Sequence, residues 1–312
     1  MNKITLTTFT DPMMGLSYEC EPVMRKLETH FAGQIEFRYA MGLLVRNVHD
    51  FMMPEDYADT EAESISRYNA RLARIYESEE SISGMPIRMD GFCLFSEEQP
   101  SSLPLNLAYK AAQLAAPELA DRFLYNLSYA TIVDTRPTTR LDEILKVVRQ
   151  TGIDEKRFLQ HYRDSSAEAA LDGDLTRMHA LGIHALPAYL LAYEGRQMLI
   201  RHLIGYDAFC EAIRRLSDGS IHPRPVEQSL SAVRQLTFGL LPSRLGRAHA
   251  SMALLSLLRQ LLERHPLISP IELREALDFR TTDEVRAFVQ PLIDSGEVSI
   301  RPVKRGWFIV RN

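Results

Sequence analysis

The start of the chain carries the pattern that most limits the fold. Residues 3–9 (KITLTTF) alternate and are rich in β-branched side chains, which predicts a strand. Asp11-Pro12 ends that strand, residues 16–31 repeat apolar side chains with helical spacing, and residues 34–41 (QIEFRYAM) predict a second strand. A strand, a tight turn, a helix and a strand form a βαβ unit, which implies parallel strands joined by a right-handed crossover.

Between residues 55 and 179 the pattern changes to helices. We expect six of them, at residues 60–78, 105–116, 118–133, 141–151, 154–162 and 166–181. Gly152 followed by Asp154 is a stop-and-restart signal between two of these helices.

Strand character returns at residues 188–193 and 197–203, and Glu194-Gly195 between them predicts a hairpin. A helix is expected at 206–216. Residues 3–216 are therefore predicted to form an α/β fold in which a helical insertion interrupts the sheet.

A polar, proline-bearing linker follows at residues 217–225 (SDGSIHPRP). After it we expect three helices and two short strands, at residues 246–264, 269–277, 281–295 and within 296–310. Three helices followed by a β-ribbon resemble a winged helix.

Composition places the chain among soluble globular proteins. It has 46% hydrophobic residues and a net charge of −5, and no apolar run approaches the roughly 20 residues that span a bilayer. The first residues, MNKITLTTFTDP, lack the apolar stretch of a signal peptide. We therefore expect a cytoplasmic protein that does not bind membranes.

The three cysteines do not form a redox motif. Cys20, Cys93 and Cys210 are widely spaced, and no pair forms C-x-x-C. We expect three unrelated, buried, reduced thiols. No group of residues has metal-ligand spacing, so we expect no metal and no cofactor, with glutathione kept open as described below.

The first strand and turn carry a specific resemblance. Asp11-Pro12 and, farther on, Glu21-Pro22 stand at the spacing found in the DsbA-like thioredoxin-fold oxidoreductases, particularly the cytoplasmic FrnE-like branch. Three further segments are also similar to that branch: VMRKLE in the expected helix, the strand ending in Met41-Gly42, and Leu186-Pro187 before a later strand. The resemblance covers roughly residues 3–216. It implies a cis Leu186–Pro187 bond facing the turn.

The chain departs from this family at the two catalytic cysteines. Met14 and Ser17 stand in their places, giving M-G-L-S. Thiol exchange needs a nucleophilic thiolate and a second, resolving thiol, and Met14 supplies neither. A serine hydroxyl is a poor nucleophile without a paired base, and no local residue is clearly that base. Cys20 lies about one turn deeper in the helix, where we expect it to be buried.

A related branch, the kappa-class glutathione transferases, resembles this chain in lacking the cysteine pair. That branch uses a serine at the first position, where this chain has Met14, and this weakens the comparison. Ser17 and the Pro187 loop could still bind glutathione or another small thiol for a transferase or isomerase reaction. Whether the chain is an enzyme therefore stays open.

The remaining property of the scaffold is its groove. In such a fold, the turn and the backbone beside the proline pair with an extended peptide as a strand adds to a sheet edge. We name Met13, Met14, Ser17, Leu186 and Pro187 as the candidate peptide-binding residues, with no confident catalytic residue among them. The alternative is that these residues are ordinary packing under the helical insertion.

The C-terminal module, residues 247–312, holds ten basic and eight acidic residues. Arg301, Lys304 and Arg305 surround its expected ribbon, which would suit phosphate contacts. The expected third helix, however, carries Asp283 and Glu284 beside a single arginine, unlike a recognition helix. We favour protein docking or dimerisation here over nucleic-acid binding, which stays open only for this module.

The sequence thus predicts a thioredoxin-fold core at 1–50 and 183–217, an inserted helical domain at 51–182, a linker at 218–246 and a winged-helix-like domain at 247–312. The first hypothesis is a family member without redox activity that acts as a cytoplasmic protein-binding or adaptor protein. The alternative is a transferase or isomerase that uses glutathione or another low-molecular-weight thiol. A protein or peptide partner is expected, and a homodimer stays open.

Overall fold

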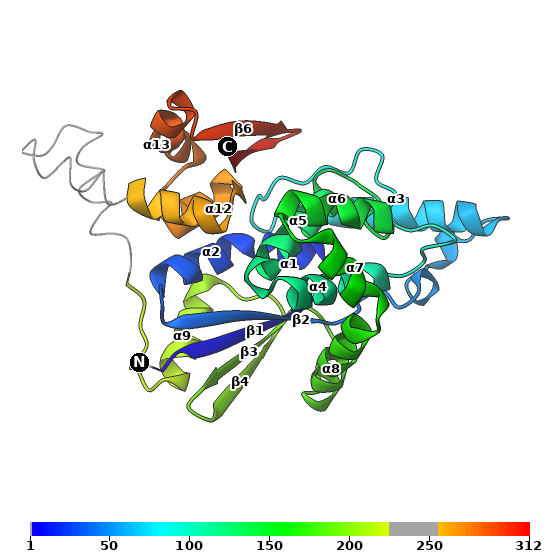
Figure 1. The fold of residues 1–312 in the computed structure, drawn as a ribbon, viewed down its shortest axis with the longest axis horizontal. Coiled ribbons are helices and arrows are strands. Elements are labelled where there is room, and N and C mark those ends of the chain that lie inside the picture. Colours follow the sequence, from blue (N-terminus) through cyan, green and yellow to red (C-terminus); the bar gives the residue numbers. More distant parts are fainter. Residues whose placement is uncertain (1, 225–254) are drawn as a thin grey trace, which may run out of the picture. The chain divides into compact units, whose positions relative to one another are not determined.

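The computed structural model describes residues 2–224 and 255–312 (Figure 1). The chain divides into two compact units. One, here called the sheet unit, comprises residues 4–19 and 36–203. The other, here called the terminal unit, comprises residues 1–3, 20–35 and 204–312. Each unit is described by itself.

The sheet unit is built on four strands in the order β2-β1-β3-β4. These are β1 (Ile4–Thr10), β2 (Ile35–Met41), β3 (Ala188–Tyr193) and β4 (Arg196–Arg201). β3 is antiparallel to both β1 and β4, so the sheet is mixed. The predicted interruption of a sheet by helices is confirmed, since β3 follows β2 only after some 145 residues of chain.

The hairpin between β3 and β4 is confirmed. Glu194 and Gly195 both have positive φ, 47° and 80°. Two such residues in succession give the turn whose twist matches that of paired antiparallel strands.

All six expected helices of the insertion form. They are α3 (Glu61–Glu79), α4 (Leu103–Ala115), α5 (Ala120–Ile132), α6 (Leu141–Thr151), α7 (Glu155–Arg163) and α8 (Ser166–Ala180). Gly152 ends α6 in the left-handed region, at φ 86°, and the Asp154 side chain accepts from the Arg157 N–H at the start of α7. Three short 3-10 turns, which sequence did not predict, are η1 (Val48–Asp50), η2 (Pro54–Asp56) and η3 (Pro117–Leu119).

The helix expected at 16–31 is two helices. α1 (Gly15–Glu19) and α2 (Glu21–His30) are separated at Cys20. The cause is Pro22, which has no N–H to donate to the carbonyl of Tyr18 and therefore breaks the ladder between the two helices.

The terminal unit combines α2 and α9 (Tyr206–Leu216) with the end of the chain. Residues 255–264 are helical and are followed by β5 (Leu267–Ile268), α12 (Pro270–Ala276), α13 (Thr282–Asp294), β6 (Val298–Val303) and β7 (Gly306–Arg311). Its three-stranded antiparallel sheet has the order β5-β7-β6, and sequence did not predict β5. The helix expected at 246–264 begins outside the described residues. Most of the linker expected at 218–246 also lies outside them.

Helix α12 packs along α2, as Figure 1 shows, and a buried set of charges joins them. Arg25 of α2 donates from Nε to the Glu272 carboxylate of α12 at 3.3 Å and from a terminal nitrogen to Glu28 at 2.7 Å. Arg25 also pairs with Glu21. The Arg25 side chain is 8% exposed and that of Glu272 is fully buried, so this guanidinium neutralises a carboxylate that water does not reach.

Replacing Arg25 with alanine is therefore expected to leave Glu272 buried without its cation. We expect Arg25→Ala to lower the free energy of unfolding of the terminal unit by about 3 kcal/mol. Urea unfolding followed by the fluorescence of Trp307, the single tryptophan, measures this, because Trp307 packs against the core of this unit.

The matched control is Arg264→Ala. Arg264 also pairs with Glu28, at 2.6 Å, but its side chain is 53% exposed, so the loss is expected to stay below about 1 kcal/mol. Equal losses in the two variants would contradict a structural role for the buried arginine.

Candidate functional site

The turn between β1 and α1 is anchored by a buried carboxylate. Asp11 is 1% exposed, and one of its oxygens accepts from the Met13 N–H at 3.1 Å. The other oxygen accepts from the Leu44 N–H, the Ser102 hydroxyl and the Asn106 amide at 2.7–2.8 Å. Burial raises the pKa of Asp11, although the bonds from Asn106 and Ser102 act in the opposite direction. One side chain thus ties the turn to the segment after β2 and to the start of α4.

Two helices of the insertion also hold the backbone of the turn. The Tyr76 hydroxyl of α3 donates to the carbonyl of Met13, and the Ser128 hydroxyl of α5 donates to that of Pro12 at 2.7 Å. Met13 and Met14 are 1% and 6% exposed. These two candidate peptide-binding residues are therefore packed in the interior rather than open to a peptide.

Ser17 is partly exposed but has no catalytic partner. Its Oγ accepts a hydrogen bond of 2.6 Å from the Thr10 hydroxyl. In the part of the chain that the structure describes, no histidine or carboxylate is bonded to it. A serine hydroxyl needs a base to become a nucleophile, so this arrangement orients Ser17 without activating it.

The second half of the candidate site lies at the same end of the sheet. Phe9 of β1 is paired with Ala188 of β3, so the turn after β1 and Pro187 before β3 leave the sheet side by side. The Leu186–Pro187 bond is cis, as the resemblance implied. Leu186 is partly buried and packs so closely on Gly42 that a Cβ there would lie 2.6 Å from its side chain.

A pair of carboxyl groups beside the turn was not predicted as part of the site. Glu19 ends α1, and one of its oxygens accepts from the Ser83 N–H at 3.0 Å. Glu79 ends α3, and its carboxylate occupies the space that a Cβ on Gly15 would need. One oxygen of each carboxyl is buried with no hydrogen-bond partner among the described residues. Glu19 flanks the turn in sequence, but the sequence gives no sign that Glu79 reaches it.

Burial raises the pKa of Glu19 to about 7 and that of Glu79 to about 7. The charge of Glu79 contributes further to the shift at Glu19. Both groups therefore keep their protons in the folded chain at pH values where the unfolded chain has released them.

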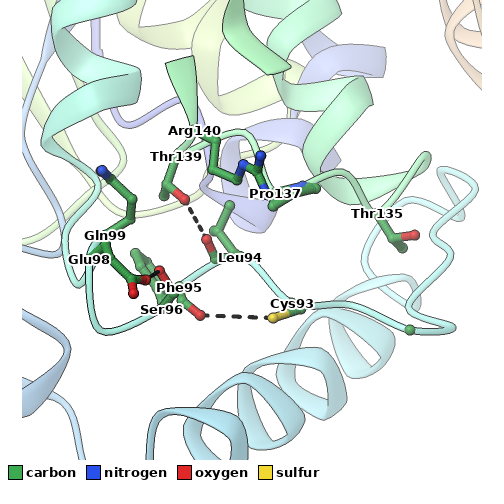
Figure 2. A pocket seen from close by; sticks show the side chains of 11 residues that line it. Cys93, Leu94, Phe95, Ser96, Glu98, Gln99, Thr135, Pro137, Thr139 and Arg140 are labelled. Atoms are coloured by element: carbon green, nitrogen blue, oxygen red, sulfur yellow. Dashed lines mark hydrogen bonds between the residues drawn. The ribbon is translucent and has the colours of Figure 1, made fainter. Parts of the chain in front are cut away.

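The three cysteines differ in exposure. Cys20 is buried, as expected, Cys210 is half-buried, and Cys93 is exposed, so the expectation of three buried thiols is wrong for Cys93. Cys93 lies in the irregular chain between α3 and α4 and lines a pocket of about 470 Å³ that segments 91–99 and 135–140 form (Figure 2). None of the candidate peptide-binding residues lines this pocket.

Residues 2–224 and 255–312 contain neither a candidate metal site nor a membrane-spanning helix. No group of three or more histidine, cysteine, aspartate or glutamate side chains is placed to hold a metal ion there. Every helix in these ranges is too short or too polar to cross a bilayer.

Comparison with known proteins supports the fold. A family profile described as Thioredoxin matches residues 7–207. The cytosolic disulfide reductase DsbM from Pseudomonas aeruginosa superimposes with a TM-score of 0.51 and 21% identity, over 68% of this chain and 99% of that one. The predicted thioredoxin fold with a helical insertion is therefore confirmed.

Two relatives carry the same name. This chain is 23% identical to the ClpXP adapter protein SpxH of Halalkalibacterium halodurans over 60% of its own length and 58% of the relative's. It is 26% identical to the protein of that name from Bacillus subtilis, over 70% of its own length and 69% of the relative's.

The carboxyl pair leads to a prediction about pH. Below about pH 4.5 both groups are protonated whether the chain is folded or not, and as pH rises to about 7 only the unfolded chain releases protons. The pair therefore lowers the free energy of unfolding over this range. Allowing for the partial exposure of Glu79, we expect Glu79→Gln to stabilise the protein by about 1 kcal/mol more at pH 8 than at pH 5.

Thermal unfolding at the two pH values measures this difference. Glu77→Gln is the control, since Glu77 lies on the same helix with its side chain exposed. If Glu79→Gln raises the stability by the same amount at both pH values, the pKa of the Glu79 carboxyl group is not raised in the folded chain.

Proposed function

Because the chain belongs to the thioredoxin family and has no cysteine at either position of the redox pair, we propose that it is an adaptor that binds another protein and presents it to a ClpXP-type protease. The observation that carries the proposal is the match to relatives named ClpXP adapters over 60–70% of this chain. Met14 and Ser17 support it, because neither can take part in thiol exchange.

We also propose that the end of the sheet where β1 and β3 meet binds an extended peptide. Ser17 and Leu186 are partly exposed there and supply the accessible side chains. Met13, Met14 and Pro187 are buried, so in this proposal they support the groove without contacting the peptide through exposed side chains. A thiol-dependent reaction at Ser17 has less support, because its hydroxyl is bonded to Thr10 rather than to a base.

The end of the terminal unit suits protein docking in this proposal. Within the predicted domain at 247–312, we infer a winged-helix-like arrangement for residues 255–312, from the order of their helices and their small sheet. Helix α13 begins with Asp283 and Glu284, which would repel phosphates, so a protein is the expected partner. We place the whole chain in the cytoplasm, with the domain boundaries predicted from the sequence.

The adaptor proposal is tested by comparing the proteomes of four strains of the source organism: wild type, a strain without this protein, a strain without ClpX, and one without both. A small set of proteins should rise on the order of threefold when this protein is removed. The same proteins should show no further rise when it is removed from cells that already lack ClpX. Accumulation that is independent of ClpX, or no accumulation at all, would overturn the adaptor function.

A further inference from the structure

One short segment of the sheet unit exposes several large apolar side chains. Residues 48–57 run through η1 and η2, and on them Phe51, Met53 and Tyr57 are 42%, 49% and 52% exposed. Seven large apolar side chains are exposed among residues 2–224 and 255–312, and three of them gather here within seven residues. We call these three side chains, with the acidic residues around them, the 48–57 surface.

The backbone beneath these side chains is held by buried charge. Asp56 is 2% exposed, and its carboxylate accepts from the Met53 N–H at 2.9 Å and from the Arg71 Nε of α3 at 2.9 Å. A terminal nitrogen of Arg71 also donates to the carbonyl of Phe51 at 2.7 Å. Phe51 and Met53 therefore project from a backbone that hydrogen bonds, made directly or through Asp56, fix to Arg71 of α3.

The backbone at Tyr57, the third exposed residue, is held in the same way by side chains of α3 that lie one turn earlier on this helix. Arg67 donates to the carbonyl of Tyr57 at 3.0 Å, and the next amide, of Ala58, donates to the Ser64 hydroxyl at 2.9 Å. The segment is irregular, yet its position does not depend on burial of its apolar side chains. Aromatic and methionine side chains on a preorganised backbone are the residues that carry binding energy in protein interfaces.

The chain segment that carries this surface is mainly acidic. Residues 46–63 contain six carboxylates and one arginine. Two of the carboxylates, those of Asp56 and Glu63, pair with Arg71 and Arg67, and a third, that of Glu61, lies 2.7 Å from the His49 ring. The other three are Asp50, Glu55 and Asp59, which are exposed and form no salt bridge with any residue that the structure describes.

We propose that the 48–57 surface docks a segment of a partner protein that combines apolar side chains with lysine or arginine. The apolar side chains would cover Phe51, Met53 and Tyr57, and the basic ones would pair with the free carboxylates. This inference rests on the proposed adaptor function and names a surface for it that is separate from the groove beside Pro187.

The test uses a fluorescein-labelled synthetic peptide of leucine and lysine at helical spacing, and the same peptide with glutamate in place of lysine. Fluorescence anisotropy against the full chain should show binding of the leucine–lysine peptide alone, weakening as salt is added. The double variant Phe51→Ser/Tyr57→Ser should raise its Kd by about tenfold or more. Leu114→Ser, at an exposed leucine of α4, is the matched control and should leave the Kd unchanged.

Equal binding of the two peptides, or an unchanged Kd in the double variant, would overturn the proposal. Both substituted side chains are exposed, so the variant should fold, which circular dichroism verifies. Expressing the double variant in the strain without this protein separates the two proposals. If the double variant fully restores ClpX-dependent turnover, the 48–57 surface is rejected and the adaptor function stands. If the wild-type protein binds the peptide but supports no ClpX-dependent turnover, the adaptor function is rejected and the surface stands.

Discussion

The buried carboxylate of Asp11 is the interaction on which the candidate site depends. It receives four hydrogen bonds, from the turn itself, from the segment after β2 and from the first turn of α4. A carboxyl group so deeply buried is stable only when its hydrogen-bond partners are all in place. The shape of the turn therefore depends on the folded helical insertion as well as on the sheet, and none of these bonds involves a thiol.

This independence explains how the scaffold persists without redox chemistry. The turn, the cis Leu186–Pro187 bond and the pairing of Phe9 with Ala188 are all present, while Met14 and Ser17 occupy the positions of the reactive pair. Tyr76 and Glu79 of α3 contact the turn at Met13 and Gly15. The chain retains this end of the sheet, and the two partner surfaces proposed here are the groove beside Pro187 and the 48–57 surface.

The sequence predicted the features that local chemistry determines. Gly152 and Asp154 marked the boundary between α6 and α7 because capping depends on neighbours, and Glu194-Gly195 marked the hairpin for the same reason. The break at Cys20 was missed although Pro22 was visible, because the apolar periodicity of 16–31 runs through it. The pairing of Arg25 with Glu272 and the approach of Glu79 to Gly15 could not be predicted, since they join residues far apart in the chain.

The turn after β1 keeps the scaffold of a thiol-disulfide site and lacks the two thiols. The most direct test is an insulin-reduction assay on the wild type and on Met14→Cys/Ser17→Cys, with both proteins reduced beforehand. We expect no turnover above background for the wild type and measurable turnover for the double variant, because a restored first cysteine would lie at the start of α1 with a resolving cysteine three residues on. Reduction of insulin by the wild type, at a rate that the double variant does not exceed, would contradict this expectation.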